Sequence, residues 1–327
     1  MISRAIGLLG AACAALAMPT PAPAQQLAPF GSQRITLVVP AVAGGATDII
    51  ARIISVHLQK ALNQTVIVEN RGGGNGNIAA LSVVRAPPDG HTLLVGTTNN
   101  LAMNQFITVN PGHDPATDYS PVAFIVDAPE LVAIPMSFPA KDMKEFVAAL
   151  KAKPGAYNYG TPGTGTVPHL SSERLLRAVG VTMAHVPFRG SAAAMAEVAN
   201  GNIQMSMATL ASIEPFRQAN TARVLAVAGK PRLKGAPEIP TLEEAGFPNL
   251  EMSNWWGVLG PKGMNPETVR ALNRHLQDAF RAPENVATLE RLGLVPYAES
   301  PEYFQAFIDK EVKVWKAVID DLGLKPQ

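Results

Sequence analysis

The chain has 327 residues, of which 47% are hydrophobic, with 27 lysines and arginines against 26 aspartates and glutamates. This near-neutral balance argues against nucleic acid or an anionic membrane surface as a partner, because both require clustered basic residues. The length allows a sizeable core and favours two lobes over a single globule.

The first 24 residues have the pattern of a secretory signal peptide. Arg4 precedes an apolar stretch at residues 5–17, and the segment ends in a small-x-small sequence at residues 22–24. A membrane anchor is the alternative, but three prolines follow the stretch, which is shorter than the roughly 20 residues that span a bilayer. We therefore expect residues 1–24 to be removed on export.

Cys13 is the only cysteine, and it lies within this segment. A lipid anchor is a weaker interpretation, because residues 10–12 lack the leucine of a lipoprotein site. The mature chain would then have no thiol, which excludes disulfides, a cysteine nucleophile and a thiolate metal site. We expect no metal and no organic cofactor.

The first part of the mature chain predicts an α/β lobe. The expected elements are a strand at 35–39, a glycine-rich turn at 40–48, a helix at 48–62, a strand at 66–69, a helix near 77–85 and a strand at 91–96. Isoleucines and leucines at helical spacing support the first helix. A strand, helix and strand in so short a segment predict a right-handed crossover between parallel strands.

The middle of the chain predicts a second lobe of the same kind. Its expected elements are a strand at 131–134, a helix at 143–152, a strand at 157–159, a second glycine-rich turn at 160–169, a helix to about 179, and strands at 203–207 and 224–228 around a helical stretch near 213–219. After a loop at 229–240, a strand at 255–259 and helices near 266–281, 284–291 and 301–322 are expected to return to the first lobe. Lobe 1 would comprise residues 25–127 and 250–327, lobe 2 residues 128–249, with two hinge crossovers.

The two glycine-rich turns carry the functional prediction, because each follows a predicted strand and opens a predicted helix. A helix N-terminus presents unpaired N–H groups and about half a positive charge, so it can hold a carboxylate or phosphate without lysine or arginine. In open α/β sheets such ligands lie beyond the carboxyl ends of the strands. We therefore expect an anion held between two helix N-termini, in a cleft between the lobes.

The sequence resembles the substrate-binding proteins of tripartite tricarboxylate transporters, the Bug receptor family. The motifs that carry this resemblance are RITLVVP at 34–40, GGATD at 44–48, VIVENR at 66–71, GNI at 76–78, PDGHTLL at 88–94, KPG at 153–155, HVPFRG at 185–190, PTLEEAG at 240–246 and WWG at 255–257. They occur in the family's order and cover essentially the whole mature chain.

The resemblance implies a periplasmic receptor with the two-lobe, type II (Venus flytrap) binding-protein fold and a mostly parallel sheet in each lobe. It implies that the lobes close on a small carboxylated solute, which the large and small membrane subunits of a transporter then receive. The protein would act as a monomer. The first turn would hold one carboxylate through backbone N–H groups and bridging waters.

The resemblance also implies a set of ligand-binding residues. In the first lobe they are Ala43, Gly44, Gly45, Thr47, Asp48, Thr97 and Thr98, and in the second lobe Gly163, Thr164, Gly165, Thr166, His169 and Thr209. No catalytic or metal-binding residues are expected.

Each of these residues also has a purely structural interpretation. The first-turn glycines would permit positive φ, and Thr47 would cap a helix. We expect Asp48 to organise its turn, since a bare carboxylate would repel an anionic ligand. His169 would hold its loop as readily as it would meet the solute, and the Trp255-Trp256 pair favours buried packing.

Two departures from the family pattern bear on specificity. Residues 41–43 are Ala-Val-Ala where many members carry prolines or an aromatic residue, which leaves a smaller, more apolar wall. Residues 207–209 are Met-Ala-Thr where relatives often place an aromatic residue and an aspartate, which weakens the case for an amino acid ligand. We expect a mono- or dicarboxylate with an apolar or aromatic body.

Two other functions are open at this point. An enzyme is disfavoured, because the chain has no Gly-x-Ser-x-Gly elbow and no His-Glu-x-x-His pair, and the glycine run at 72–76 lacks the lysine of a phosphate-binding loop. A periplasmic sensor that feeds a signalling protein would need the same closing fold, so the sequence does not separate it from a transport receptor.

Overall fold

The computed structural model describes residues 33–326, so the predicted signal peptide lies outside the described residues. In chain order, the elements of the first half are β1 (Ile35–Val39), α1 (Ala46–Leu62), β2 (Val66–Asn70), η1 (Gly74–Gly76), α2 (Asn77–Val84), β3 (Thr92–Thr97), η2 (Asn99–Met103), α3 (Asn104–Ile107), β4 (Tyr119–Pro129), β5 (Leu131–Pro135), α4 (Met143–Ala152) and β6 (Asn158–Thr161).

The elements of the second half are α5 (Val167–Val179), β7 (Ala184–Pro187), α6 (Ser191–Ala199), β8 (Met205–Ala208), α7 (Leu210–Gln218), β9 (Ala222–Val227), β10 (Ser253–Pro261), α8 (Pro266–Arg281), α9 (Pro283–Arg291), β11 (Val295–Pro296) and α10 (Pro301–Leu322). None of these helices is both long and apolar enough to cross a bilayer.

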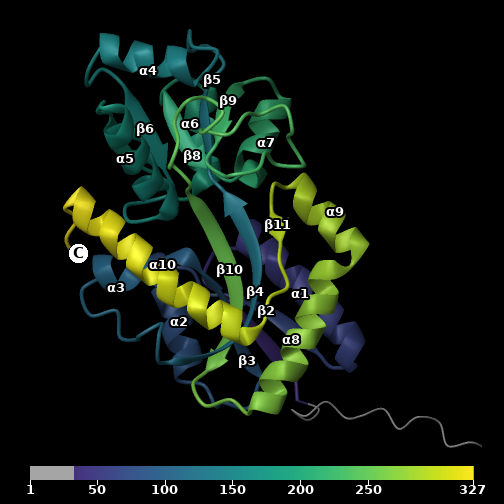
Figure 1. Cartoon of the computed structure of the whole chain (residues 1–327). Helices are drawn as coiled ribbons and strands as arrows, with labels where there is room; N and C mark the ends of the chain where they lie inside the picture. The colour runs from purple at the N-terminus through teal and green to yellow at the C-terminus, as the bar shows by residue number, and fades with distance from the viewer. Residues whose placement is uncertain (1–32, 327) are drawn as a thin grey trace, which may run out of the picture.

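Two sheets organise the molecule, and helices pack around each (Figure 1). Sheet A has six strands in the order β11-β4-β10-β3-β1-β2, and sheet B has five in the order β7-β6-β8-β5-β9. Sheet A therefore combines the first part of the chain with β10 and β11, whereas sheet B is built from the middle. This is the α/β two-lobe arrangement that the sequence predicts.

Both sheets are mixed: most strands of each sheet run in one direction, as expected, and antiparallel strands are inserted among them. In sheet A, β1 is parallel to β2 and β3, but β10 runs antiparallel to both β3 and β4, as β11 does to β4. In sheet B, β6 is parallel to β7 and β8, whereas β5 is antiparallel to β8 and β9. Two of the antiparallel strands, β5 and β10, directly follow a passage of the chain between the sheets.

The chain passes between the sheets at β4–β5 and again before β10. Glu130 lies between β4 and β5; its N–H donates to the carbonyl of Met252 (2.9 Å), and its carbonyl accepts from the N–H of Ala228 (2.8 Å). In Figure 1, β4 and β10 run side by side from the lower sheet toward the upper one, and α10 crosses the same region.

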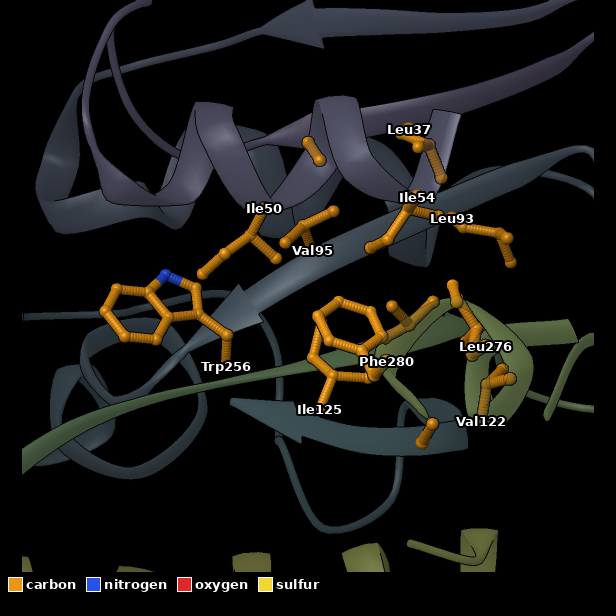
Figure 2. Packing of buried hydrophobic residues seen from close by; sticks show 14 of the residues in the cluster. Leu37, Ile50, Ile54, Leu93, Val95, Val122, Ile125, Trp256, Leu276 and Phe280 are labelled. Atoms are coloured by element: carbon orange, nitrogen blue, oxygen red, sulfur yellow. The ribbon is translucent and has the colours of Figure 1, made fainter. Parts of the chain in front are cut away.

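Helices α1 and α8 bury one face of sheet A. Ile50 and Ile54 on α1 pack with Leu276 and Phe280 on α8, and the indole of Trp256 closes the same cluster (Figure 2). All five side chains are at most 2% exposed. Burial of this kind stabilises by about 1.5–3 kcal/mol per large apolar side chain, which fixes α1 and the turn that precedes it.

Candidate functional site

The first glycine-rich turn joins β1 to α1 and leaves the helix without a side-chain cap. The N-cap residue is Gly45 (φ −87°, ψ 176°), whereas α4, α8 and α10 are capped by the side chains of Asp142, Asn265 and Ser300. Gly44 has φ +89°, a conformation that favours glycine. Residues 43–45 are exposed, so the turn that opens α1 lies at the surface, and the helix has no side-chain cap there.

Asp48 is bonded to its own turn. Its carboxylate accepts from the N–H of Gly44 (3.1 Å), from Nε and Nη2 of Arg52 (2.9 and 3.2 Å) and from Nδ2 of Asn70 (3.2 Å). Burial alone would raise the pKa of Asp48, but the hydrogen bonds from Arg52, Gly44 and Asn70 outweigh it and lower that pKa. The carboxylate therefore stays ionised and holds the turn in shape.

The tryptophan pair holds the threonines of the first lobe. Trp256 Nε1 donates to Thr47 Oγ1 (2.8 Å), and the backbone N–H of Trp255 donates to Thr98 Oγ1 (2.8 Å). Thr97 is also held in place, because its backbone N–H donates to Asn100 Oδ1 (2.7 Å). Since β1 and β3 are parallel, residues 97–98 lie at the same sheet edge as the first turn.

The second glycine-rich turn joins β6 to α5 in the same manner. Its N-cap is Thr166 (φ −84°, ψ 161°), which makes no side-chain cap; its hydroxyl donates to the carbonyl of Gly163 instead (2.7 Å). Gly163 and Gly165 have φ of +151° and +74°. Thr164 is exposed. The start of α5 therefore has no side-chain cap, and neither does the start of α1. Pro168 in the first turn of α5 has no N–H, and the N–H of Gly163 donates to Thr161 Oγ1 (3.3 Å).

His169 holds the second turn from inside. The N–H of Gly165 donates to its Nδ1 (3.1 Å), and its ring stacks on that of His185 with 4.1 Å between centroids. Burial lowers the pKa of His169 to about 4. The imidazole is therefore neutral at pH 7, and acceptance at Nδ1 places its proton on Nε2.

Thr209 lies between β8 and α7. It is the N-cap of that helix, again without a side-chain cap, and it is 8% exposed. Because β6 and β8 are parallel, Thr209 lies at the same edge of sheet B as the second turn.

Two asparagines of the first half contact the second turn. Asn99 Nδ2 donates to the carbonyl of Gly165 (3.1 Å), and Asn75 Nδ2 lies 3.5 Å from the carbonyl of Thr164. Asn75 follows the run of glycines that packs on the first turn, since a Cβ at Gly72 would lie 3.6 Å from the backbone nitrogen of Val42. The two turns therefore share neighbours. Sequence reasoning missed both asparagines, although the glycine run beside Asn75 was a signal.

Comparison with known proteins identifies the family of this chain. The profile of the tripartite tricarboxylate transporter family receptor, TctC, matches residues 50–324. The chain belongs to this family. TctC-family members are solute-binding receptors, which confirms the expectation of a binding protein rather than an enzyme.

Several solved structures share the fold over most of their length. Rpa4515 from R. palustris, solved with adipate, is 32% identical with a TM-score of 0.85, over 90% of this chain and 99% of that one. The periplasmic binding protein BugD is 28% identical (TM-score 0.82, 90% and 99% covered). MatC from Rhodopseudomonas palustris, solved with malate, is 29% identical (TM-score 0.79, 88% and 99% covered).

Proposed function

We propose that this chain is a periplasmic receptor that binds a small carboxylate between its lobes and delivers it to the large and small membrane subunits of a tripartite transporter. The observation that carries the proposal is the pair of uncapped helix N-termini at α1 and α5, whose turns are connected through Asn75 and Asn99. Two such ends, each with a partial positive charge, suit a ligand with an anionic group at either end.

The ligands of two relatives and the residues of the two turns support a proposal for the class of ligand. Adipate and malate, the ligands of two solved relatives, are both dicarboxylates. In this chain, Val42 is 77% exposed beside the first turn, and no arginine or lysine occurs at residues 40–47 or 160–169. We propose a mono- or dicarboxylate with an apolar or aromatic body, held by main-chain N–H groups at residues 43–47 and 163–166 other than those of Gly44, Gly163 and Gly165, which donate within their own turns.

Ligand binding would be coupled to closure of the lobes. We assign residues 25–127 and 250–327 to one lobe and 128–249 to the other, with residues 1–24 as a cleaved signal peptide and the monomer as the working unit. A ligand that touches both turns favours the closed state only by its extra affinity for that state. The crossings beside Glu130 and Met252 are the proposed hinge.

Calorimetric titration tests the proposal. The purified protein is titrated with aliphatic and aromatic dicarboxylates, matching monocarboxylates, citrate, aspartate and glutamate. We expect saturable one-to-one binding of at least one carboxylate without an amino group, with the solute recovered unchanged. Binding of aspartate or glutamate alone would overturn the proposed ligand class, and conversion of the solute would overturn the receptor itself.

A further inference from the structure

A group of potential metal ligands lies where α1 and α8 pack together, apart from the two turns. Residues 57, 275 and 278 provide it: His57 comes from α1, and His275 and Asp278 come from α8, one turn apart. One donor atom from each side chain lies within 4.8 Å of the other two. This is the one such group among residues 33–326.

The buried seam between the helices fixes these side chains. Leu58, next to His57, and Leu276, next to His275, are at most 1% exposed and belong to the core cluster shown in part in Figure 2. The two histidines are half-buried at the edge of this seam, whereas Asp278 is exposed. All three ligands therefore stand on packed helices, and the exposed side chain of Asp278 has room to rotate toward the two histidines.

The chemistry of the three groups suits a borderline-soft divalent ion. Zn²⁺ takes histidine nitrogens at about 2.0–2.1 Å and carboxylate oxygens at about 2.0–2.2 Å, usually in a tetrahedron. Tetrahedral ligands at those lengths lie roughly 3.3 Å apart, so the donor atoms need to approach one another by a modest side-chain rotation. Water would complete the coordination.

The imidazoles are available for a metal. Within residues 33–326, neither His57 nor His275 makes a hydrogen bond that would occupy a ring nitrogen.

We propose that His57, His275 and Asp278 form a binding site for a divalent transition-metal ion, with Zn²⁺ as the probe, that bridges α1 and α8. The site is independent of the proposed carboxylate site. A bound ion would join the helix that begins at the first glycine-rich turn to its main packing partner.

Zn²⁺ titration of the untagged, chelator-treated protein tests this proposal. We expect one-to-one binding and, at a hundred times Kd, a rise in Tm of about 5 °C. His57→Gln, His275→Gln and Asp278→Asn should each weaken binding at least tenfold, while Asp309→Asn, an exposed aspartate on α10, should not. Circular dichroism and carboxylate binding of each variant report folding and receptor function separately.

Co²⁺ provides a second readout that does not depend on stability. We expect visible d–d absorption of four-coordinate intensity in the unaltered protein and in Asp309→Asn, and its loss in His275→Gln. Equal Zn²⁺ affinity in the three ligand variants, or a Co²⁺ spectrum that none of them changes, would overturn the site. Loss on histidine replacement but not in Asp278→Asn would overturn the three-ligand assignment.

Discussion

Glu130, at the proposed hinge, should make the stability of this protein fall as pH rises through neutrality. Its side chain is 0% exposed, and within residues 33–326 both carboxyl oxygens lack a hydrogen-bond partner. Burial raises the pKa of Glu130 to about 8, from an ordinary value of 4.5. We predict that Glu130→Gln removes most of this pH dependence.

The direction of this pH dependence is set by how many protons the folded and unfolded states bind. Between pH 4.5 and 8 the folded state keeps the Glu130 proton and the unfolded state releases it, so the free energy of unfolding falls as pH rises. The contribution is complete below pH 4.5 and lost above pH 8. Its slope is at most about 1.4 kcal/mol per pH unit, which amounts to about 3 kcal/mol between pH 5 and pH 7.5.

Urea unfolding of the original protein and Glu130→Gln at several pH values measures this term. Subtracting the free energy of unfolding of one protein from that of the other removes the contribution of the buried histidines. Their lowered pKa values make stability rise with pH below pH 6.5, opposite to the effect of Glu130. We expect the variant to gain about 3 kcal/mol relative to the original protein from pH 5 to pH 7.5. Glu243→Gln, at an exposed glutamate, should show no such change. A Glu130→Gln difference that stays constant with pH would refute the reasoning.

Three further predictions concern the turns. Gly45→Val should reduce carboxylate affinity at least tenfold, because its side chain blocks the approach to the turn's N–H groups. It should lower the free energy of unfolding by no more than about 1 kcal/mol, the cost of a poor N-cap residue, because Gly45 has an ordinary φ and a Cβ there meets nothing within 4 Å; unchanged calorimetric affinity would count against the first turn as a carboxylate site. Thr164→Ala should cost about 1 kcal/mol of binding, roughly fivefold in Kd, whereas Thr164→Ser should retain affinity; a much larger loss would assign Thr164 to loop structure. His169 should remain a neutral Nε2–H tautomer at pH 6 by nitrogen-15 NMR of its imidazole, and a protonated ring at that pH would contradict the buried Gly165 contact.

Much of the fold could be predicted from local pattern. The strand, turn and helix around residues 35–62 were expected because apolar residues change from a strand run to helical spacing there, and the helix begins at Ala46, two residues earlier than predicted. Which strands run antiparallel was not predicted, since a buried antiparallel strand such as β10 shows the same continuous apolar run as a parallel one.

The long strand β4 was missed for a physical reason. It begins and ends near prolines, Pro121 and Pro129, which argue against a central strand. The structure accommodates Pro121 where the register between β4 and β10 shifts, between Val258 and Leu259. Irregular pairing of this kind depends on the partner strand, so it leaves no signal in the segment itself.

The site was predictable as two turns but not as a network. Glycine spacing and family resemblance pointed to residues 43–47 and 163–166, whose role in binding stays a prediction. The contacts from Trp256 to Thr47 and from Asn99 to Gly165 join residues far apart in the sequence. Only the packing of the sheets brings them together, so no local pattern could have revealed them.

A crystal structure with a bound dicarboxylate such as adipate tests the central claim most directly. We predict carboxylate oxygens at about 2.7–3.1 Å from main-chain N–H groups of residues 43–47 at one end and 163–166 at the other. A ligand held instead by arginine or lysine side chains, with neither helix N-terminus in contact, would contradict this account.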